Sequence, residues 1–457
     1  MDDKTQMPPF DNERTQLGNF GQDAGRTQAF DPSRTQMAGA AHPSTTLRVA
    51  LDMQCTAGNR YAAATHGSRE HVLVSLMASG AMGGARMPLN LSLIIDRSAS
   101  MEGQPLEYVK RACSYVVDLL EPNDILSVVT FEERVEILMP ARRVVNKALI
   151  KEHINRIECG NTTNLYDGIA AGASQVASVP GSGYVNRALL FTDGDPTAGI
   201  KDFGSIVGLV AEQKSRGVTV TALGFGGEYN EELLAGIAKR AGGNYYYITR
   251  PELIPEVFRK ELETLMTVVA RNLHLTINLS RWVQVRQVYG RQPTFGNRTS
   301  EVTLPDVERG SAESALVEIE LGQRPAGTYR VAKFVLTYDD SVTGRQERIE
   351  QDVVLEFTAD ESLIGANVNP QVERELEVAM ASRNLERTVM GMRTQQISPA
   401  AAMNELQKTK AMLVSQGKIV QANDIQQAID DIKQGAAPEK TLMGTIYNLD
   451  RGKGGGK

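Results

Sequence analysis

The sequence has few cysteines and no long apolar run. Its three cysteines, Cys55, Cys113 and Cys159, are an odd number without close spacing, and this pattern predicts neither a disulfide framework nor a zinc site. The first residues, MDDKTQMPPF, are polar and acidic, so we expect no secretion signal. No stretch approaches the ~18 uninterrupted apolar residues of a membrane-spanning helix. Together these absences predict a cytoplasmic protein with free thiols.

Concentrated positive charge is also lacking. The formal net charge is −6 over 457 residues, and basic residues are scattered among acidic ones. Because nucleic-acid binding requires a concentrated basic surface, we expect no nucleic-acid partner. A hydrophobic content of 41% is sufficient for a globular core, and the length accommodates two or three domains.

Hydrophobic periodicity divides the chain into segments. Residues 1–44 are poor in branched aliphatic side chains and rich in polar residues, Gly and Pro, which predicts a disordered tail. Residues 89–270 alternate short apolar runs with helical patterns, which predicts an α/β domain with a doubly wound, mostly parallel sheet covered on both faces. Residues 271–365 contain runs of period two separated by turn residues, typical of an antiparallel β-sandwich.

The remaining segments flank these two domains. Two strand-like runs within residues 45–88 need partners, because an isolated hairpin is only marginally stable. We expect them to pair with the later sandwich, so that the α/β domain is an insertion within it. Residues 366–435 have helical periodicity, broken near Pro399 and Gly417, and predict two or three packed helices. Residues 436–457 end in RGKGGGK and predict a second disordered tail.

Oxygen-bearing side chains recur in three loops of the predicted α/β domain. Asp96, Ser98 and Ser100 follow the apolar run 89–96; Asp193 ends the run 187–193, and the loop 160–165 carries two threonines. Ligands of doubly wound sheets bind beyond the carboxyl ends of the strands. Hard divalent cations prefer oxygen ligands. The pattern therefore predicts a Mg²⁺ site, with Mn²⁺ and Ca²⁺ as alternatives.

The segments DRSAS, GNTTNL and FTDGD resemble the metal-ion-dependent adhesion site of the von Willebrand factor A (VWA) family, over residues 88–270. The flanking arrangement resembles bacterial members with an inter-α-trypsin-inhibitor-like or channel-like label. The resemblance implies a metal centre in which a partner's Asp or Glu completes the metal shell. Carried over by position, the implied ligands are Asp96, Ser98, Ser100, Thr163 and Asp193. Thr162, adjacent to Thr163, is the alternative in the second loop.

Catalysis is not expected from these loops. None of the five histidines lies in them, whereas metal-assisted hydrolysis needs a general base or a second metal site. We predict a protein-binding adaptor with no catalytic residue. The alternatives are a VWA partner subunit of an AAA+ ATPase of the MoxR or chelatase type, a metallohydrolase, and a protein in which the metal only stabilises the fold.

A second pattern repeats in the N-terminal tail, where Thr5, Thr15, Thr27 and Thr35 each lie in a Lys/Arg-Thr-Gln motif. Thr441, which follows a lysine near the C-terminus, is a fifth candidate. A phosphate on threonine adds up to two negative charges and three acceptors. The motifs resemble phosphothreonine sites made by bacterial serine/threonine kinases for forkhead-associated domains. The alternative is a low-complexity tail that repeats for reasons unrelated to modification.

Overall fold

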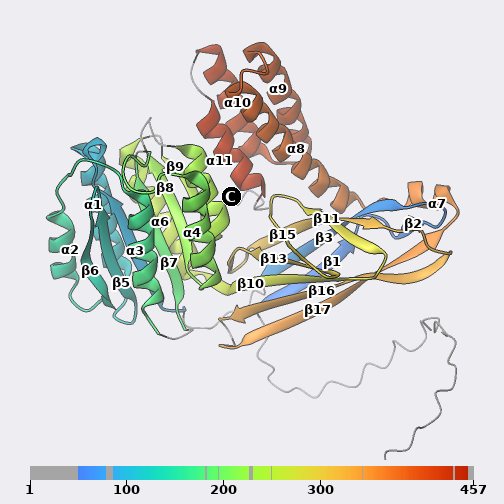
Figure 1. Cartoon of the computed structure of the whole chain (residues 1–457), viewed down its shortest axis with the longest axis horizontal. Helices are drawn as coiled ribbons and strands as arrows, with labels where there is room; N and C mark the ends of the chain where they lie inside the picture. Colours follow the sequence, from blue (N-terminus) through green and yellow to red (C-terminus); the bar gives the residue numbers. More distant parts are fainter. Residues whose placement is uncertain are drawn as a thin grey trace, which may run out of the picture. The chain divides into compact units, whose positions relative to one another are not determined.

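A computed structural model of the chain describes residues 50–78, 86–180, 183–193, 195–225, 230–248, 250–341, 343–435 and 438–450. The predicted tail of residues 1–44 lies outside these ranges. Within them, no helix has the length and apolar character needed to cross a membrane. The structure contains an α/β domain, an antiparallel β-sandwich and a set of C-terminal helices (Figure 1), which confirms the predicted fold class.

The α/β domain is built on a six-stranded sheet with the order β6-β5-β4-β7-β8-β9. All neighbouring strands are parallel except β6, which runs antiparallel to β5. Strand β4 lies in the middle of the sheet, five of its eight residues are apolar, and all eight are buried because helices cover both faces. The strands are β4 (Leu89–Asp96), β5 (Ile125–Phe131), β6 (Val135–Arg143), β7 (Val185–Thr192), β8 (Thr219–Phe225) and β9 (Tyr245–Ile248).

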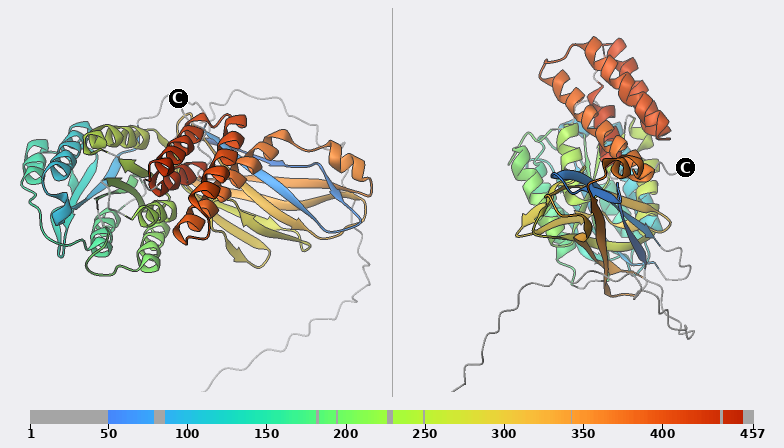
Figure 2. Two further views of the ribbon diagram at one scale, coloured as in Figure 1. Left: turned by 90° about the horizontal axis from the view of Figure 1, so that it is seen from above. Right: turned by 90° about the vertical axis from the view of Figure 1, so that its right-hand side faces the viewer.

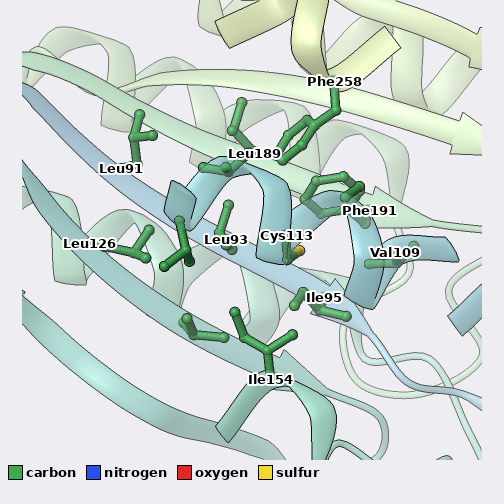
Figure 3. Packing of buried hydrophobic residues seen from close by; sticks show 14 of the residues in the cluster. Leu91, Leu93, Ile95, Val109, Cys113, Leu126, Ile154, Leu189, Phe191 and Phe258 are labelled. Carbon is green, nitrogen blue, oxygen red and sulfur yellow. The ribbon is translucent and has the colours of Figure 1, made fainter. Parts of the chain in front are cut away.

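Alternate residues of β4 face opposite layers of helices. Leu93 and Ile95 pack in the core formed with α1 (Gln104–Leu119), α2 (Lys147–Asn155) and α6 (Ile254–Met266), where the rings of Phe191 and Phe258 meet edge to face at 4.9 Å (Figure 3). Ile94 packs in the opposite core with α3 (Leu165–Ala177), α4 (Phe203–Ser215) and α5 (Glu231–Ala241). A short 3-10 turn (Pro251–Leu253) precedes α6.

The β-sandwich is formed by segments from both sides of the α/β domain. One sheet has the order β1-β3-β15-β11, and the other has the order β12-β13-β10-β16-β17-β2 with β14 also paired to β10. Strand β3 pairs with β15 over ten residue pairs, from Met77–Ala312 to Ser68–Leu321. The α/β domain is therefore inserted into the sandwich. The strands are β1 (Leu51–Ala57), β2 (Tyr61–Ala63), β3 (Ser68–Ala78), β10 (Val268–Leu279), β11 (Val283–Val288), β12 (Thr294–Gly296), β13 (Thr299–Leu304), β14 (Val307–Glu308), β15 (Ala312–Leu321), β16 (Gly327–Asp340) and β17 (Gln346–Thr358).

The two domains meet at the amino end of β7. Arg187 donates to Asp306 at 3.0 Å, and both side chains are at most 8% exposed. Lys214 approaches the same carboxylate at 3.8 Å. Arg271 of β10 donates to the carbonyl of Tyr184 just before β7. These contacts join the sandwich to the edge of the sheet at which β7 begins.

The C-terminal region is helical. After α7 (Glu361–Ala366), the long helices α8 (Pro370–Arg393), α9 (Pro399–Ser415) and α10 (Ile419–Lys433) pack side by side (Figure 2). The side chains of Asn369 and Ser398 cap α8 and α9 by accepting backbone amides of the first turn. Gly417, with φ 72°, lies between α9 and α10.

The prediction of a disordered tail over residues 436–457 was wrong for its central part. Residues Glu439–Asp450 form α11, whose buried Leu442, Ile446 and Leu449 complete the core of the helical bundle. Tyr447 packs instead in the core of the α/β domain beside α5. The apolar residues of α11 are spaced three and four apart, as in an amphipathic helix. We did not predict the helix because the glycine-rich residues that follow it indicate disorder.

Tyr447 is 5% exposed, its ring meets that of Tyr245 edge to face, and its hydroxyl donates to the carbonyl of Gly243. We therefore predict that Tyr447→Ala destabilises the protein by about 3–5 kcal/mol. Tyr447→Phe keeps the ring and should cost only about 1 kcal/mol. Urea unfolding of both variants measures this. Equal and negligible effects would show that α11 does not contribute to folding.

Candidate metal centre

Asp96 is held rigidly in the candidate centre by burial and by hydrogen bonds to both of its carboxylate oxygens. It ends β4, and its side chain is completely buried. One carboxylate oxygen accepts the backbone amide of Ser98 at 2.8 Å, and the other accepts the hydroxyl of Thr192 at 2.6 Å. Strands β4 and β7 are neighbours, so the carboxylate joins the ends of two parallel strands.

The following loop carries two serines at alternate positions. A short 3-10 turn (Ala99–Met101) is anchored by Met101, which is fully buried. Ser98 is also buried, whereas Ser100 is exposed. Their hydroxyl oxygens are 3.1 Å apart, and Ser100 donates to the carboxylate of Asp193 at 2.8 Å. Two loops that are distant in sequence therefore share one cluster of oxygen atoms.

The second loop is tied to both of the others through its backbone. The amide of Gly160 donates to the carbonyl of Arg97 at 2.6 Å, and the carbonyl of Asn161 accepts the amide of Ala99 at 3.2 Å. On its other side, the amide of Thr163 donates to the hydroxyl of Thr197 at 2.9 Å. The loop that carries Thr163 is thus held between the loops that carry Ser98 and Asp193.

Helix α3 fixes where this loop ends. Asn164 caps the helix by accepting the amide of Asp167. Further along α3, a side chain at Gly172 would place its first carbon 2.3 Å from Ile94 of β4. Glycine there allows the helix to approach the central strand closely, and this draws the preceding loop towards the end of β4.

Four of the five predicted ligands, Asp96, Ser98, Ser100 and Asp193, form side-chain hydrogen bonds within the cluster. Their partners are one another, the hydroxyl of Thr192 and the backbone amide of Ser98. Thr163 is 3% exposed and is connected through its backbone. The hydroxyl oxygen of Thr162 is buried and has no hydrogen-bond partner in the described part of the chain. Both threonines therefore remain candidates for the second loop.

The electrostatics of the cluster suit a cation. Burial and, to a smaller extent, the negative charge of Asp193 raise the pKa of Asp96 to about 6, against the hydrogen bonds from Thr192 and Ser98 that lower it. A divalent cation beside these oxygens would favour the ionised carboxylates. Within the described ranges, no group of three or more His, Cys, Asp and Glu side chains is arranged to hold a metal ion. The centre therefore combines two carboxylates with hydroxyls, a donor set that fits a hard cation.

Two supporting residues were not predicted. Thr192 binds Asp96, and Thr197 orients the amide of Thr163. The signal for Thr192 was its place directly before Asp193 at the end of a buried strand. Thr197 lies beyond a short turn, and its sequence carries no comparable signal.

Comparison with known proteins identifies the domain. Residues 90–260 match the von Willebrand factor type A domain family. The uncharacterized protein sll0103 of Synechocystis is 30% identical over 319 residues, which cover 68% of this chain and 75% of that protein. The chain therefore belongs to the VWA-domain proteins, whose members often bind a divalent metal at the adhesion site.

Other relatives match a smaller part of their own length. Protein YfbK of Escherichia coli is 29% identical over 52% of this chain and 42% of YfbK. Human inter-alpha-trypsin inhibitor heavy chain H4 is 26% identical over 48% of this chain and 26% of its own length. The chain thus spans less than half of both relatives, and the similarity to the inhibitor heavy chains is distant.

Two solved structures share most of the fold. The von Willebrand factor type A protein from Catenulispora acidiphila has a TM-score of 0.72 over 88% of this chain and 96% of its own, at 17% identity. The ArnB paralog VWA2 from Sulfolobus acidocaldarius has a TM-score of 0.63 over 89% of this chain and 100% of its own, at 18% identity. These similarities extend the shared fold beyond the VWA domain.

The phosphorylation candidates have a different outcome. Thr5, Thr15, Thr27 and Thr35 lie outside the described residues. Thr441 lies in the first turn of α11, half-buried, and its carbonyl accepts the hydroxyl of Thr445. The premise that Thr441 belongs to a flexible tail was wrong.

We predict that Thr163→Ala weakens Mg²⁺ binding at least about tenfold because a ligand is lost, whereas Thr162→Ala changes it less than about twofold. Titration calorimetry on metal-stripped protein measures both. Ser178→Ala, at the exposed end of α3, is the control. A loss in Thr162→Ala alone would assign the ligand to Thr162, and a loss in neither would remove the second loop from the centre.

Proposed function

We propose that this protein is a metal-dependent adaptor whose VWA domain captures an acidic residue of a partner protein. The observation that carries the proposal is the hydrogen bond between Ser100 and Asp193, which closes two separate loops into one oxygen cluster. Mg²⁺ is the cation we favour, and Mn²⁺ and Ca²⁺ fit the same donors.

The burial pattern of the cluster supports capture of a partner. Asp96 and Ser98 are buried, and Asp193 is 8% exposed, whereas Ser100 is exposed. Residues Asp96, Ser98, Ser100, Thr163 and Asp193 would hold the cation, which supplies positive charge for an incoming carboxylate. Neutral hydroxyls form most of this donor set, so a carboxylate from outside adds a charged ligand that the chain does not itself provide.

The chemistry proposed is binding without turnover. A hydrolase would need a general base beside the metal, and the two carboxylates of the cluster, Asp96 and Asp193, already accept hydrogen bonds from hydroxyls and a backbone amide. We further propose that the protein acts in the cytoplasm as part of a bacterial signalling system.

We predict that capture of partners from native lysate requires both metal and Asp96. Wild-type protein in Mg²⁺ should retain a partner that is lost in EDTA and in Asp96→Asn, because the variant removes an anionic group without changing its shape. Asp52→Asn, an exposed position on β1, is the matched control. Mass spectrometry identifies what is retained.

The identity of the captured protein separates the alternatives. Metal-dependent recovery of an AAA+ ATPase would replace the signalling proposal with a role as its partner subunit. Turnover of phosphoesters or peptides in Mg²⁺ or Mn²⁺ would replace it with a hydrolase. Partners that survive both EDTA and Asp96→Asn would contradict metal-dependent capture and leave the cation a stabilising role only.

The repeated Lys/Arg-Thr-Gln motifs support a second element of the proposal. Four such motifs within about 35 residues present several equivalent sites, and multiple sites raise avidity through effective concentration. We propose that a serine/threonine kinase phosphorylates these threonines and that a forkhead-associated domain binds the product.

The tail element has its own test. Replacing Thr5, Thr15, Thr27 and Thr35 with Ala should abolish kinase-dependent binding of a forkhead-associated domain, while Mg²⁺ binding stays unchanged. Replacing Thr45 and Thr46, two threonines outside the motifs, with Ala is the control. Phosphopeptide mapping after incubation with the native kinase fraction, with no phosphate found on the four threonines, would contradict it.

A further inference from the structure

A second candidate site lies at one end of the β-sandwich, far along the chain from the metal loops. It is a pocket of about 350 Å³ between the turn after β10, the β12–β13 turn, the segment after β15 and the start of β16. Five of the nine residues that line it are cationic, and the described lining includes no acidic side chain. The cationic residues are Arg281, Arg298, Arg324, Arg330 and Lys333.

Backbone hydrogen bonds hold the walls of this basic pocket together. The amide of Leu279 donates to the carbonyl of Arg298 at 2.9 Å, and the amide of Ser280 donates to the carbonyl of Val331 at 3.1 Å. Gly322 donates to the carbonyl of Trp282 at 2.8 Å. Segments from four parts of the sandwich are thus fixed against one another, and the backbone positions that carry the cationic side chains are set by the sheet.

The positive charge of the basic pocket is only partly neutralised. Arg330 lies 3.5 Å from Asp352, and Lys333 pairs with Glu350. The other three arginines form no ion pair with any residue that the structure describes. Three guanidinium groups close to one another repel, and an anion bound among them would relieve this repulsion.

Arg324 is held in place for such an anion. Its guanidinium carbon lies 4.8 Å from the centre of the Trp282 ring, a cation–π arrangement. Its Nε is buried and has no hydrogen-bond partner among the described residues. A buried N–H without an acceptor is unfavourable. The stacking on Trp282 therefore orients the Arg324 side chain, while its Nε donor is left for an acceptor from outside the chain.

Arg298 occupies a backbone position that disfavours it. In the β12–β13 turn its φ is 57°, in the left-handed region where glycine is favoured. An arginine there carries a conformational cost that glycine would avoid. Its long cationic side chain at the rim of the basic pocket is the feature that distinguishes it from glycine.

We propose that the basic pocket binds a phosphate monoester. Guanidinium groups bind phosphate oxygens through paired, charge-assisted hydrogen bonds, and a phosphate dianion matches several uncompensated cations better than a single carboxylate does. The phosphate is carried either by a phosphothreonine or by a small phosphorylated molecule. Only the phosphothreonine source rests on the proposed function.

The test uses Trp282, the single tryptophan of the chain, as a fluorescence reporter in the full-length protein. The probe is a synthetic peptide with the sequence of residues 9–20 and a phosphate on the residue equivalent to Thr15. Matched peptides carry unmodified threonine or glutamate there, and inorganic phosphate is titrated separately. All titrations are made in EDTA, so that loss of metal-dependent capture cannot affect the result.

We expect the phosphopeptide to change Trp282 fluorescence and to bind at least about tenfold more weakly to Arg324→Gln and to Arg298→Gln. Arg345→Gln, an exposed arginine in the turn before β17, should bind as wild type. Arg298→Gln lies on an exposed turn, so it tests the proposal even if Arg324→Gln fails to fold.

The peptide arms distinguish the sources. Binding of the phosphopeptide at concentrations where inorganic phosphate does not compete supports a phosphothreonine ligand. Equal competition by inorganic phosphate supports a small phosphorylated ligand. Equal binding of the unmodified or glutamate peptide, or phosphopeptide binding that is unchanged in both arginine variants, would overturn the proposal.

Discussion

Burial of the Asp96 carboxylate is the constraint on which the candidate centre depends. Its two oxygens fasten the end of β4 to the following loop and to Thr192 of β7, and Ser100 then reaches Asp193 from that loop. Burial is the largest of the causes that raise the pKa of Asp96 to about 6, so the ionised form is less favoured there than in water. A divalent cation would reverse this, since it stabilises the charged form of its ligands. The protein thus holds in place a buried carboxylate whose ionised form a bound cation would stabilise.

The described contacts of the sandwich with the VWA domain lie away from this centre. Contacts with the sandwich gather where β7 begins, through Arg187 and the carbonyl of Tyr184. Thr192 and Asp193 lie where the same strand ends. Since β7 is eight residues long, roughly 25 Å separates its two ends. The sandwich therefore contacts the domain at the end of β7 opposite the candidate metal centre. A partner can approach the exposed Ser100 without displacing the sandwich.

The fold could be predicted from hydrophobic periodicity because the α/β domain and the β-sandwich each have their own pattern of apolar residues along the sequence. The buried runs of β4, β5, β7 and β8 marked the sheet, and the three-loop motif marked its ligand-binding edge. Strand β6 gives no such apolar run, because it lies at the sheet edge, is half-exposed and contains Pro140. Helix α11 was missed because the glycine-rich ending obscured its apolar spacing. The choice between Thr162 and Thr163 depends on loop register, which sequence does not fix, and the tail threonines remain predictions.

Anomalous diffraction from crystals grown with Mn²⁺ would show whether a cation binds where the three loops meet. We expect one anomalous peak within coordination distance of the hydroxyls of Ser98 and Ser100, bordered by Asp96, Asp193 and a threonine of the second loop. The peak should be absent from crystals of Asp96→Asn. Absence of the peak in the wild type at millimolar Mn²⁺, or a peak that persists in Asp96→Asn, would rule out a metal centre held by Asp96.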